Sequence, residues 1–122
     1  MSHTWLVYDI GTGSTKAALI QDHQVIKTAS LGYETDFGGN GQVEQNPDDW
    51  WGAFQQVTRK LDPSEVDGMI LTGQMQDLIL LDDEAQMIRP VILYNDMRAV
   101  SQMEQIEAII DSTMMSEITG ND

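Results

Sequence analysis

Short apolar blocks separated by polar turns occupy the first part of the chain and predict three successive strands. The first block runs from Thr4 to Ile10 and ends at the turn Gly11-Thr12-Gly13-Ser14, and its nearly continuous apolar character is typical of a strand buried on both faces. The second runs from Thr15 to Ile20, and the third, Val25 to Leu31, alternates loosely. Because the connecting turns are short, the pattern predicts a three-stranded antiparallel meander.

A glycine-rich loop over residues 36–41 precedes the clearest helix. Asn46 is suited to cap this helix and Pro47 to occupy its first position, and two aspartates follow where the helix dipole favours them. Trp50 is expected to pack in the core, and Glu44 is expected to have a structural role. The apolar residues recur four, three and four positions apart, at Trp50, Phe54, Val57 and Leu61.

Three further apolar blocks predict a short buried strand at Met69 to Thr72 and two more strands at Leu78 to Leu81 and Val91 to Tyr94. A second helix is expected from Met97, and Ser112 is expected to cap a last short helix. The apolar face of the second helix comprises Ala99, Met103, Ile106 and Ile110. The order of elements predicts an α/β fold, in which helices pack on a mixed sheet that includes the antiparallel meander.

Composition narrows the functional classes. The 122 residues correspond to one small domain or to a piece of a larger one. Six basic and 20 acidic side chains give a net charge of −14, which argues against nucleic acid or a membrane as a partner. The chain has no cysteine and no apolar run of transmembrane length, so a cytoplasmic location is expected. A bound phosphate would need a metal ion or backbone N–H groups to offset the negative field.

The turn after the first strand is the main candidate site. Its spacing fits neither the P-loop nor the dinucleotide-binding fingerprint. Asp9, at the end of the strand, is a candidate Mg²⁺ ligand, and the N–H groups and hydroxyls of the turn are candidate phosphate contacts. Aspartate, glycine, serine and threonine are also common in ordinary turns, so a purely structural role is the alternative.

Four segments, taken in order, carry a resemblance to a known family. The first, Asp9 to Lys16, is similar to the first phosphate motif of the actin-like ATPase superfamily. Residues 41–51 resemble the segment before the first helix of FGGY carbohydrate kinases, residues 73–77 the Gly-Gln-Met-His-Gly of the xylulokinase-like branch, and residues 89–98 its Arg-Pro-x-Ile-Leu-Trp-Asn-Asp-x-Arg. Ile118 to Asn121 also matches the family.

The resemblance implies a ribonuclease H-like, actin-like ATPase domain that transfers the γ-phosphate of ATP to a sugar or polyol hydroxyl with Mg²⁺. Asp9 would then help to place the metal. The residues implied to face the phosphates are Gly11, Thr12, Gly13, Ser14 and Thr15. For Lys16, a phosphate contact and a solvated surface position stay open.

On the sugar side, the resemblance implies contacts from Met75 and Gln76 and from the loop that follows. Gln76 stands in place of the family's histidine and Asp77 in place of its glycine, which leaves the identity of the sugar open. Asp96 and Arg98 match the family's Asp-x-Arg, and they either line the sugar cleft or pair with each other to brace the loop.

The family's catalytic base and adenine pocket lie beyond the segment that these motifs cover. We therefore expect residues 1–122 to be the N-terminal part of the first kinase domain, truncated at its C-terminal side and inactive alone. The expected partners are a sugar or polyol, the remainder of the kinase chain and a second copy in a homodimer. The alternative is a non-catalytic phosphate- or sugar-binding half-domain that acts with a partner chain.

Overall fold

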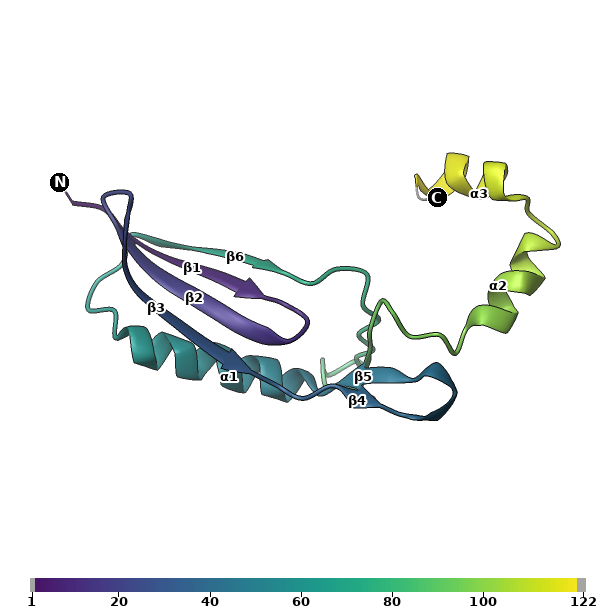
Figure 1. The fold of residues 1–122 in the computed structure, drawn as a ribbon, viewed down its shortest axis with the longest axis horizontal. Coiled ribbons are helices and arrows are strands. Elements are labelled where there is room, and N and C mark those ends of the chain that lie inside the picture. The colour runs from purple at the N-terminus through teal and green to yellow at the C-terminus, as the bar shows by residue number, and fades with distance from the viewer. Residues whose placement is uncertain (1, 121–122) are drawn as a thin grey trace.

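The computed structural model describes residues 2–120 and is built on a four-stranded sheet with one long helix across one face (Figure 1). The strand order is β3-β2-β1-β6. The strands are β1 (Thr4–Ile10), β2 (Ser14–Gln21), β3 (Gln24–Gly32) and β6 (Gly68–Gly73). β1, β2 and β3 pair antiparallel and β6 runs parallel to β1, which confirms the predicted meander and mixed sheet.

Helix α1 (Pro47–Leu61) follows β5 in the chain and leads back to β6, which lets β6 pair parallel to β1. The helix begins as predicted, because the Asn46 side chain accepts a hydrogen bond from the N–H of Asp48. It ends at Asp62, whose left-handed backbone lets its N–H reach the carbonyl of Thr58.

The main core lies between this sheet and α1. Its buried residues are Leu6, Tyr8, Ala17, Val57 and Leu61. Tyr8 also packs on the ring of Phe54 and shares a 2.8 Å hydrogen bond with the hydroxyl of Thr58. These contacts help to position α1 on the sheet.

Two predictions of burial are wrong. In β1, only Leu6 and Tyr8 are buried, whereas Trp5 on the other face is 40% exposed. In β6, which was expected to be buried, Ile70 is 57% exposed. The reason is that α1 covers a single face and packs on β2 and β3, while β6 forms the edge of the sheet.

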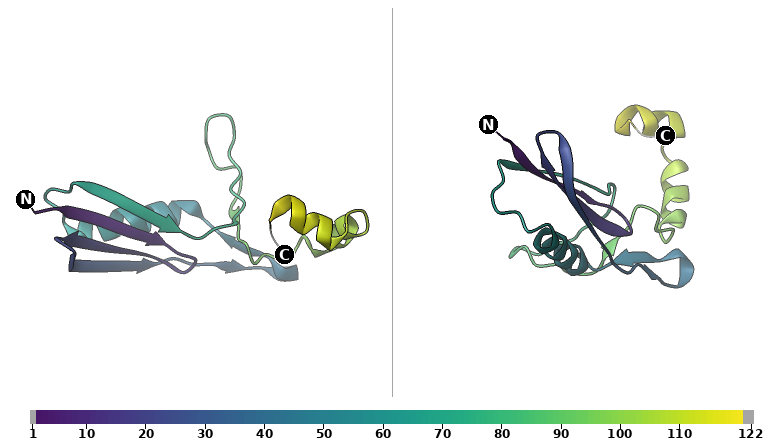
Figure 2. Two further views of the ribbon diagram at one scale, coloured as in Figure 1. Left: turned by 90° about the horizontal axis from the view of Figure 1, so that it is seen from above. Right: turned by 60° about the vertical axis from the view of Figure 1, so that its left-hand side comes forward.

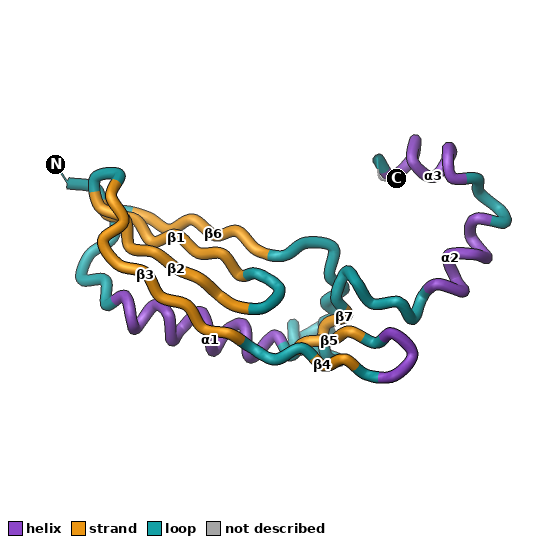
Figure 3. The backbone as a smooth tube through the Cα atoms, in the orientation of Figure 1, coloured by secondary structure: helices purple, strands orange, loops and turns teal. Residues whose placement is uncertain are grey.

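A second, antiparallel sheet continues from the far end of the first (Figure 3). Its order is β4-β5-β7, with β4 (Asp36–Phe37), β5 (Val43–Gln45) and β7 (Val91–Ile92). Val43, Val91 and Leu93 form its small core, and Trp50 packs against them, as expected for this tryptophan. Sequence reasoning expected one sheet and did not predict β5.

Other details of this region also differ from the predictions. The expected loop at 36–41 contains β4 and the 3-10 helix η1 (Gly39–Gly41). The strand expected at Leu78 to Leu81 is absent from the described chain. Leu78 makes an isolated antiparallel bridge to Ile92 of β7, and Leu81 makes one to Met87 within a projecting loop (Figure 2). The strand expected to reach Tyr94 ends at Ile92, because Leu93 begins a turn closed by the N–H of Asp96.

Helices α2 (Val100–Glu107) and α3 (Ser112–Thr119) extend away from both sheets, at the end of the molecule opposite the N-terminus (Figures 1 and 2). Neither contains a buried residue. α2 begins after the predicted Met97 and ends before Ile110, so the expected apolar face is shorter. Asp111, rather than Ser112, caps α3 by accepting the N–H of Met114.

Two further points concern the last family-like segment and the question of a membrane-spanning helix. Asn121, part of the last family-like segment, lies outside the described residues. Within residues 2–120, no helix combines the length and apolar character needed to cross a bilayer.

Candidate functional site

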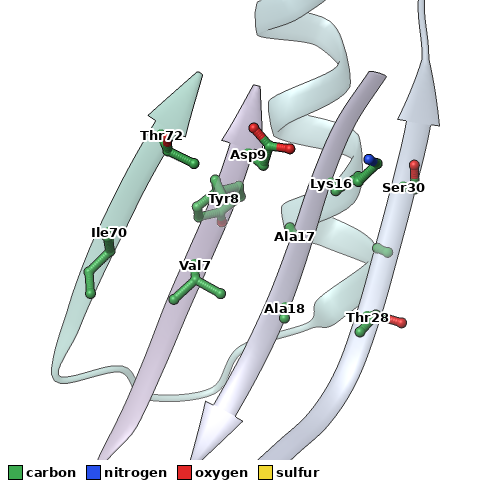
Figure 4. A pocket seen from close by; sticks show the side chains of 11 residues that line it. Val7, Tyr8, Asp9, Lys16, Ala17, Ala18, Thr28, Ser30, Ile70 and Thr72 are labelled. Atoms are coloured by element: carbon green, nitrogen blue, oxygen red, sulfur yellow. The ribbon is translucent and has the colours of Figure 1, made fainter. Parts of the chain in front are cut away.

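The glycine turn lies at the end of β1 and is closed by a 3.0 Å hydrogen bond from the N–H of Gly11 to the carbonyl of Ser14. Asp9 pairs in register with Lys16 on β2. Strand alternation places both side chains on the sheet face opposite α1, at one end of an open groove (Figure 4). The structure therefore places a carboxylate and an amine beside the turn.

The carbonyl groups of the turn are held by other parts of the chain. The hydroxyl of Tyr33 donates to the carbonyl of Gly11, and its N–H donates to the carbonyl of Gly13. The side-chain amide of Gln45 donates to the carbonyl of Thr12 at 2.6 Å. In a trans peptide the N–H points opposite to the carbonyl, so the N–H groups of Thr12 and Gly13 are directed away from these donors. Within the described chain, these two N–H groups make no hydrogen bond.

Glycine at position 13 is not required by the fold. Its φ is not left-handed, and a Cβ added there would meet no atom of residues 2–120 within 4 Å. By contrast, a Cβ at Gly73 would lie 3.0 Å from the carbonyl oxygen of Ile10, so that glycine serves close strand packing. Open space beside unpaired N–H groups at Gly13 is what an anion approaching the backbone would need.

Thr15 and Lys16 lie on opposite faces of β2. Thr15 is fully buried on the α1 side of β2. The side chain of Thr15 therefore faces away from Asp9. Only the backbone of Thr15 stays a predicted phosphate contact. Lys16 is exposed on the face of Asp9, so both interpretations of this lysine stay open. Burial and the nearby Asp9 charge raise the pKa of Tyr33, which keeps its hydroxyl protonated as a donor.

Among residues 2–120 no cluster of three or more histidine or acidic side chains could enclose a metal ion. Asp9 therefore belongs to no such cluster of three among the described residues. This donor set fits Mg²⁺, which keeps several waters and binds through one or two carboxylates together with substrate phosphates.

The candidate sugar contacts fall into two groups, those that line a common groove and those that do not. Gln76, Asp96 and Arg98 line one open groove together with Arg89 and Tyr94. Gln76 has a left-handed backbone, with φ of 66°.

The other two candidates lie on the same loop but outside the lining of that groove. Met75 is 77% exposed. The carboxylate of Asp77 accepts the N–H of Tyr94 at 3.0 Å, and burial raises the pKa of this carboxyl. The structure therefore brings three of the five candidates together in the groove and gives Asp77 a bracing contact instead.

Asp96 and Arg98 also form an ion-pair cluster. The Arg98 Nε lies 3.0 Å from both carboxylate oxygens of Asp96, and the hydrogen bonds from Arg98 hold the pKa of Asp96 well below its usual range. Glu44, buried as expected for a structural residue, accepts from Arg98 and Arg89. Asp96 accepts the N–H of Val43 as well. The pair braces the loop while one side of it faces the groove, so the two interpretations of these residues are compatible.

Sequence reasoning missed two residues that bear on the turn, Tyr33 and Gln45. Gln45 lies within a family-like segment, but a single glutamine in a short strand carries no periodic signal. Tyr33 follows the glycine at the end of β3, and its contact with Gly11 depends on the meander folding back. Both roles arise from tertiary contacts.

The N-terminal domain of the FGGY family of carbohydrate kinases matches residues 4–122. The fold is accordingly that of an actin-like ATPase α/β domain, of which the chain contains a short N-terminal portion. The chain belongs to the FGGY family of carbohydrate kinases.

Particular relatives point to one branch of the family. The chain is 33% identical over 120 residues to a xylulose kinase of Lactococcus lactis subsp. lactis, an alignment that covers 93% of this chain and 24% of the relative. The crystal structure of xylulose kinase from Rhodospirillum rubrum is similar with a TM-score of 0.84 and 28% identity, covering 91% of this chain and 25% of that one. A structure described as a xyloylose kinase from Brucella ovis gives a TM-score of 0.87 and 31% identity, over 98% and 26% of the two chains. The chain thus spans about a quarter of the length of these relatives.

Proposed function

We propose that this chain is the N-terminal part, residues 1–122, of the first domain of a xylulose-kinase-like enzyme that transfers the γ-phosphate of ATP to a sugar or polyol hydroxyl. The observation that carries the proposal is the glycine turn, where the N–H groups of Thr12 and Gly13 are unpaired within the described residues and where a Cβ added at Gly11 would lie 3.7 Å from the Asp9 carboxylate. Family membership and the xylulose kinase relatives support the same reaction.

In this proposal the turn binds phosphate oxygens through backbone N–H groups. Thr12 and Gly13 supply the two free donors, and Gly11, Ser14 and the Thr15 backbone complete the turn. Asp9 would hold Mg²⁺ directly or through water, and the bound ion would offset the charge of the phosphates in this acidic chain. Lys16 pairs in register with Asp9, lies on the same face and is a candidate cation.

The groove beside Gln76, Asp96 and Arg98 is proposed to bind the sugar or polyol. Gln76 offers both a donor and an acceptor to a hydroxyl, and Arg98 is held in place by Asp96. Asp77 is bonded to the Tyr94 backbone, so its role is to shape the loop that presents Met75 and Gln76. The particular sugar depends on this groove and on the rest of the enzyme.

Several further features are proposed for the whole enzyme. The catalytic base and the adenine pocket belong to the part of the relatives that this chain does not span, so the isolated chain would not phosphorylate sugar. The enzyme is proposed to be cytoplasmic and to pair with a second copy. The 122-residue part is not expected to bind nucleic acid, because its six basic residues cannot offset its 20 acidic ones.

The first experiment is to read the genomic frame that contains this chain and to assay the complete product with ATP and a panel of pentoses, polyols and sugar acids. We expect a second domain and magnesium-dependent phosphorylation of at least one compound. A chain that ends at residue 122 and binds phosphate or sugar without transferring phosphate would instead support the half-domain alternative.

The second experiment replaces Asp9 by asparagine in the complete kinase. We expect kcat/KM for MgATP to fall by about 100-fold or more, because the carboxylate charge is lost while the side-chain shape stays. Asp83→Asn, the same change in a distant exposed turn, should leave the rate unchanged. Equal rates for wild type and Asp9→Asn would contradict the role of Asp9.

A further inference from the structure

We infer that Gln45 is a positioning residue that joins the glycine turn to the loop carrying Met75 and Gln76, so that the two halves of the site are held in one arrangement. The inference rests on the proposed function for the ligands of these halves, and its structural part is testable without any ligand.

The side chain of Gln45 is surrounded by partners from separate parts of the chain. The residue is 3% exposed. Its Nε2 donates to the carbonyl of Thr12 and to the hydroxyl of Thr35, each at 2.6 Å. Its Oε1 accepts from Trp50 Nε1 at 2.8 Å and from Gln74 Nε2 at 3.3 Å. All the hydrogens and the oxygen of the amide are thus engaged.

The orientation of this amide is determined by its partners. A backbone carbonyl such as that of Thr12 can only accept, and an indole N–H such as that of Trp50 can only donate. The nitrogen of Gln45 must therefore face Thr12 and its oxygen must face Trp50. A glutamate of the same shape would place an anionic oxygen against the Thr12 carbonyl, which is repulsive at short distance.

Gln74 connects this amide to the second half of the site. Its backbone N–H donates to the carbonyl of Ile10 at 2.9 Å, immediately before the glycine turn, and its side chain donates to Gln45. The next two residues are the sugar candidates Met75 and Gln76. A shift of the Gln45 side chain therefore changes its hydrogen bond to the turn and its hydrogen bond to this loop together.

Tyr33 provides a matched comparison. Its hydroxyl also supports the turn, through the carbonyl of Gly11, but the contacts described for it do not include Gln74. Removing this hydroxyl should loosen the turn alone, whereas changing Gln45 should loosen both segments. The difference separates a connecting role from a general contribution to stability.

The first test measures amide hydrogen exchange in the full 122-residue chain. Two hydrogen-bonded amides act as reporters, Gly11 for the turn and Gln74 for the loop. In Gln45→Glu we expect both amides to exchange at least about tenfold faster, while amides in the middle of β1 and β2 keep their rates. In Tyr33→Phe we expect faster exchange at Gly11 only.

Gln45→Met, which has similar length and no charge, gives a second variant if the glutamate prevents folding, and it should show the same pattern. Unchanged exchange at Gln74 in the Gln45 variants would overturn the inference. Equal acceleration throughout the sheet would also overturn it, because it would show only a loss of overall stability.

The second test uses the complete kinase. Gln45→Met should raise KM for both MgATP and sugar by at least about fivefold, and Tyr33→Phe should raise KM for MgATP alone. An effect of Gln45→Met confined to one substrate would refute the link. If the complete protein phosphorylates no sugar, the proposed function fails, and the exchange experiment still decides whether Gln45 joins the two segments.

Discussion

Replacing Leu61 by alanine tests how α1 is attached to the sheet that carries the site. Leu61 is the last residue of α1 and is 1% exposed. It belongs to a small core cluster that also contains Leu6, Tyr8, Ala17 and Val57. The substitution removes every side-chain atom beyond Cβ and leaves a cavity between the helix and the sheet.

The expected cost follows from this burial. Fully buried leucines replaced by alanine lose about 2–5 kcal/mol of stability, and about 3 kcal/mol is expected here because the site lies at a helix end that can partly relax. With a urea dependence of about 2 kcal/mol per molar, the unfolding midpoint should fall by about 1.5 M. The melting temperature should fall by about 12 °C for a chain of this size.

The assay is urea unfolding of the 122-residue chain, followed by circular dichroism and tryptophan fluorescence. Leu71→Ala is the matched control, because it removes the same atoms from a residue that is 53% exposed on β6, and it should cost less than about 1 kcal/mol. A loss below 1 kcal/mol for Leu61→Ala, or equal losses in the two variants, would refute the packing of α1 described above.

Three other predictions concern capping and charge. Asn46→Ala removes the cap of α1 and should cost about 1 kcal/mol in urea unfolding; unchanged stability would contradict the capping contact. Because Arg98 depresses the pKa of Asp96, the charged pair stabilises the fold at neutral pH, and this contribution should be lost as the pH falls below about 4. Asp96→Asn should therefore flatten the fall of unfolding free energy in acid, and an equal slope would refute this reasoning. Burial raises the pKa of Asp77, so its charge opposes folding at neutral pH, and Asp77→Asn should not lower stability at pH 7 while Tyr94 retains an acceptor; a clear loss at pH 7 would contradict it.

Local features of the fold were predictable because their signals are local. The meander was visible in the spacing of apolar blocks and turns, and α1 in its cap and 3.6-residue period. Strands of two or three residues, such as β4 and β5, carry too few positions for any period to show. Burial of β1 and β6 was overestimated, since an apolar strand does not reveal which of its faces a helix covers.

The candidate site likewise combines features that the sequence predicts with features that only the folded chain shows. Asp9 and the glycine turn were predicted from residue types and their order and stay a prediction, whereas the pairing of Asp96 with Arg98 was foreseen as one of two alternatives and is present. The structure placed the Thr15 side chain on the far face of β2, which strand alternation determines once the buried face is known.

The sequence by itself determined the three antiparallel strands, the helix that follows them and the membership of a kinase family, because these depend on residue types at short spacing. Only the tertiary structure decided which face of the sheet α1 covers and which groups hold the glycine turn. Gln45 joins Thr12, Thr35, Trp50 and Gln74, from four separate parts of the chain, by hydrogen bonds whose geometry exists only after folding. A buried amide with all its hydrogen bonds made is specific because any change leaves a partner unsatisfied, and no pattern along the chain records that condition.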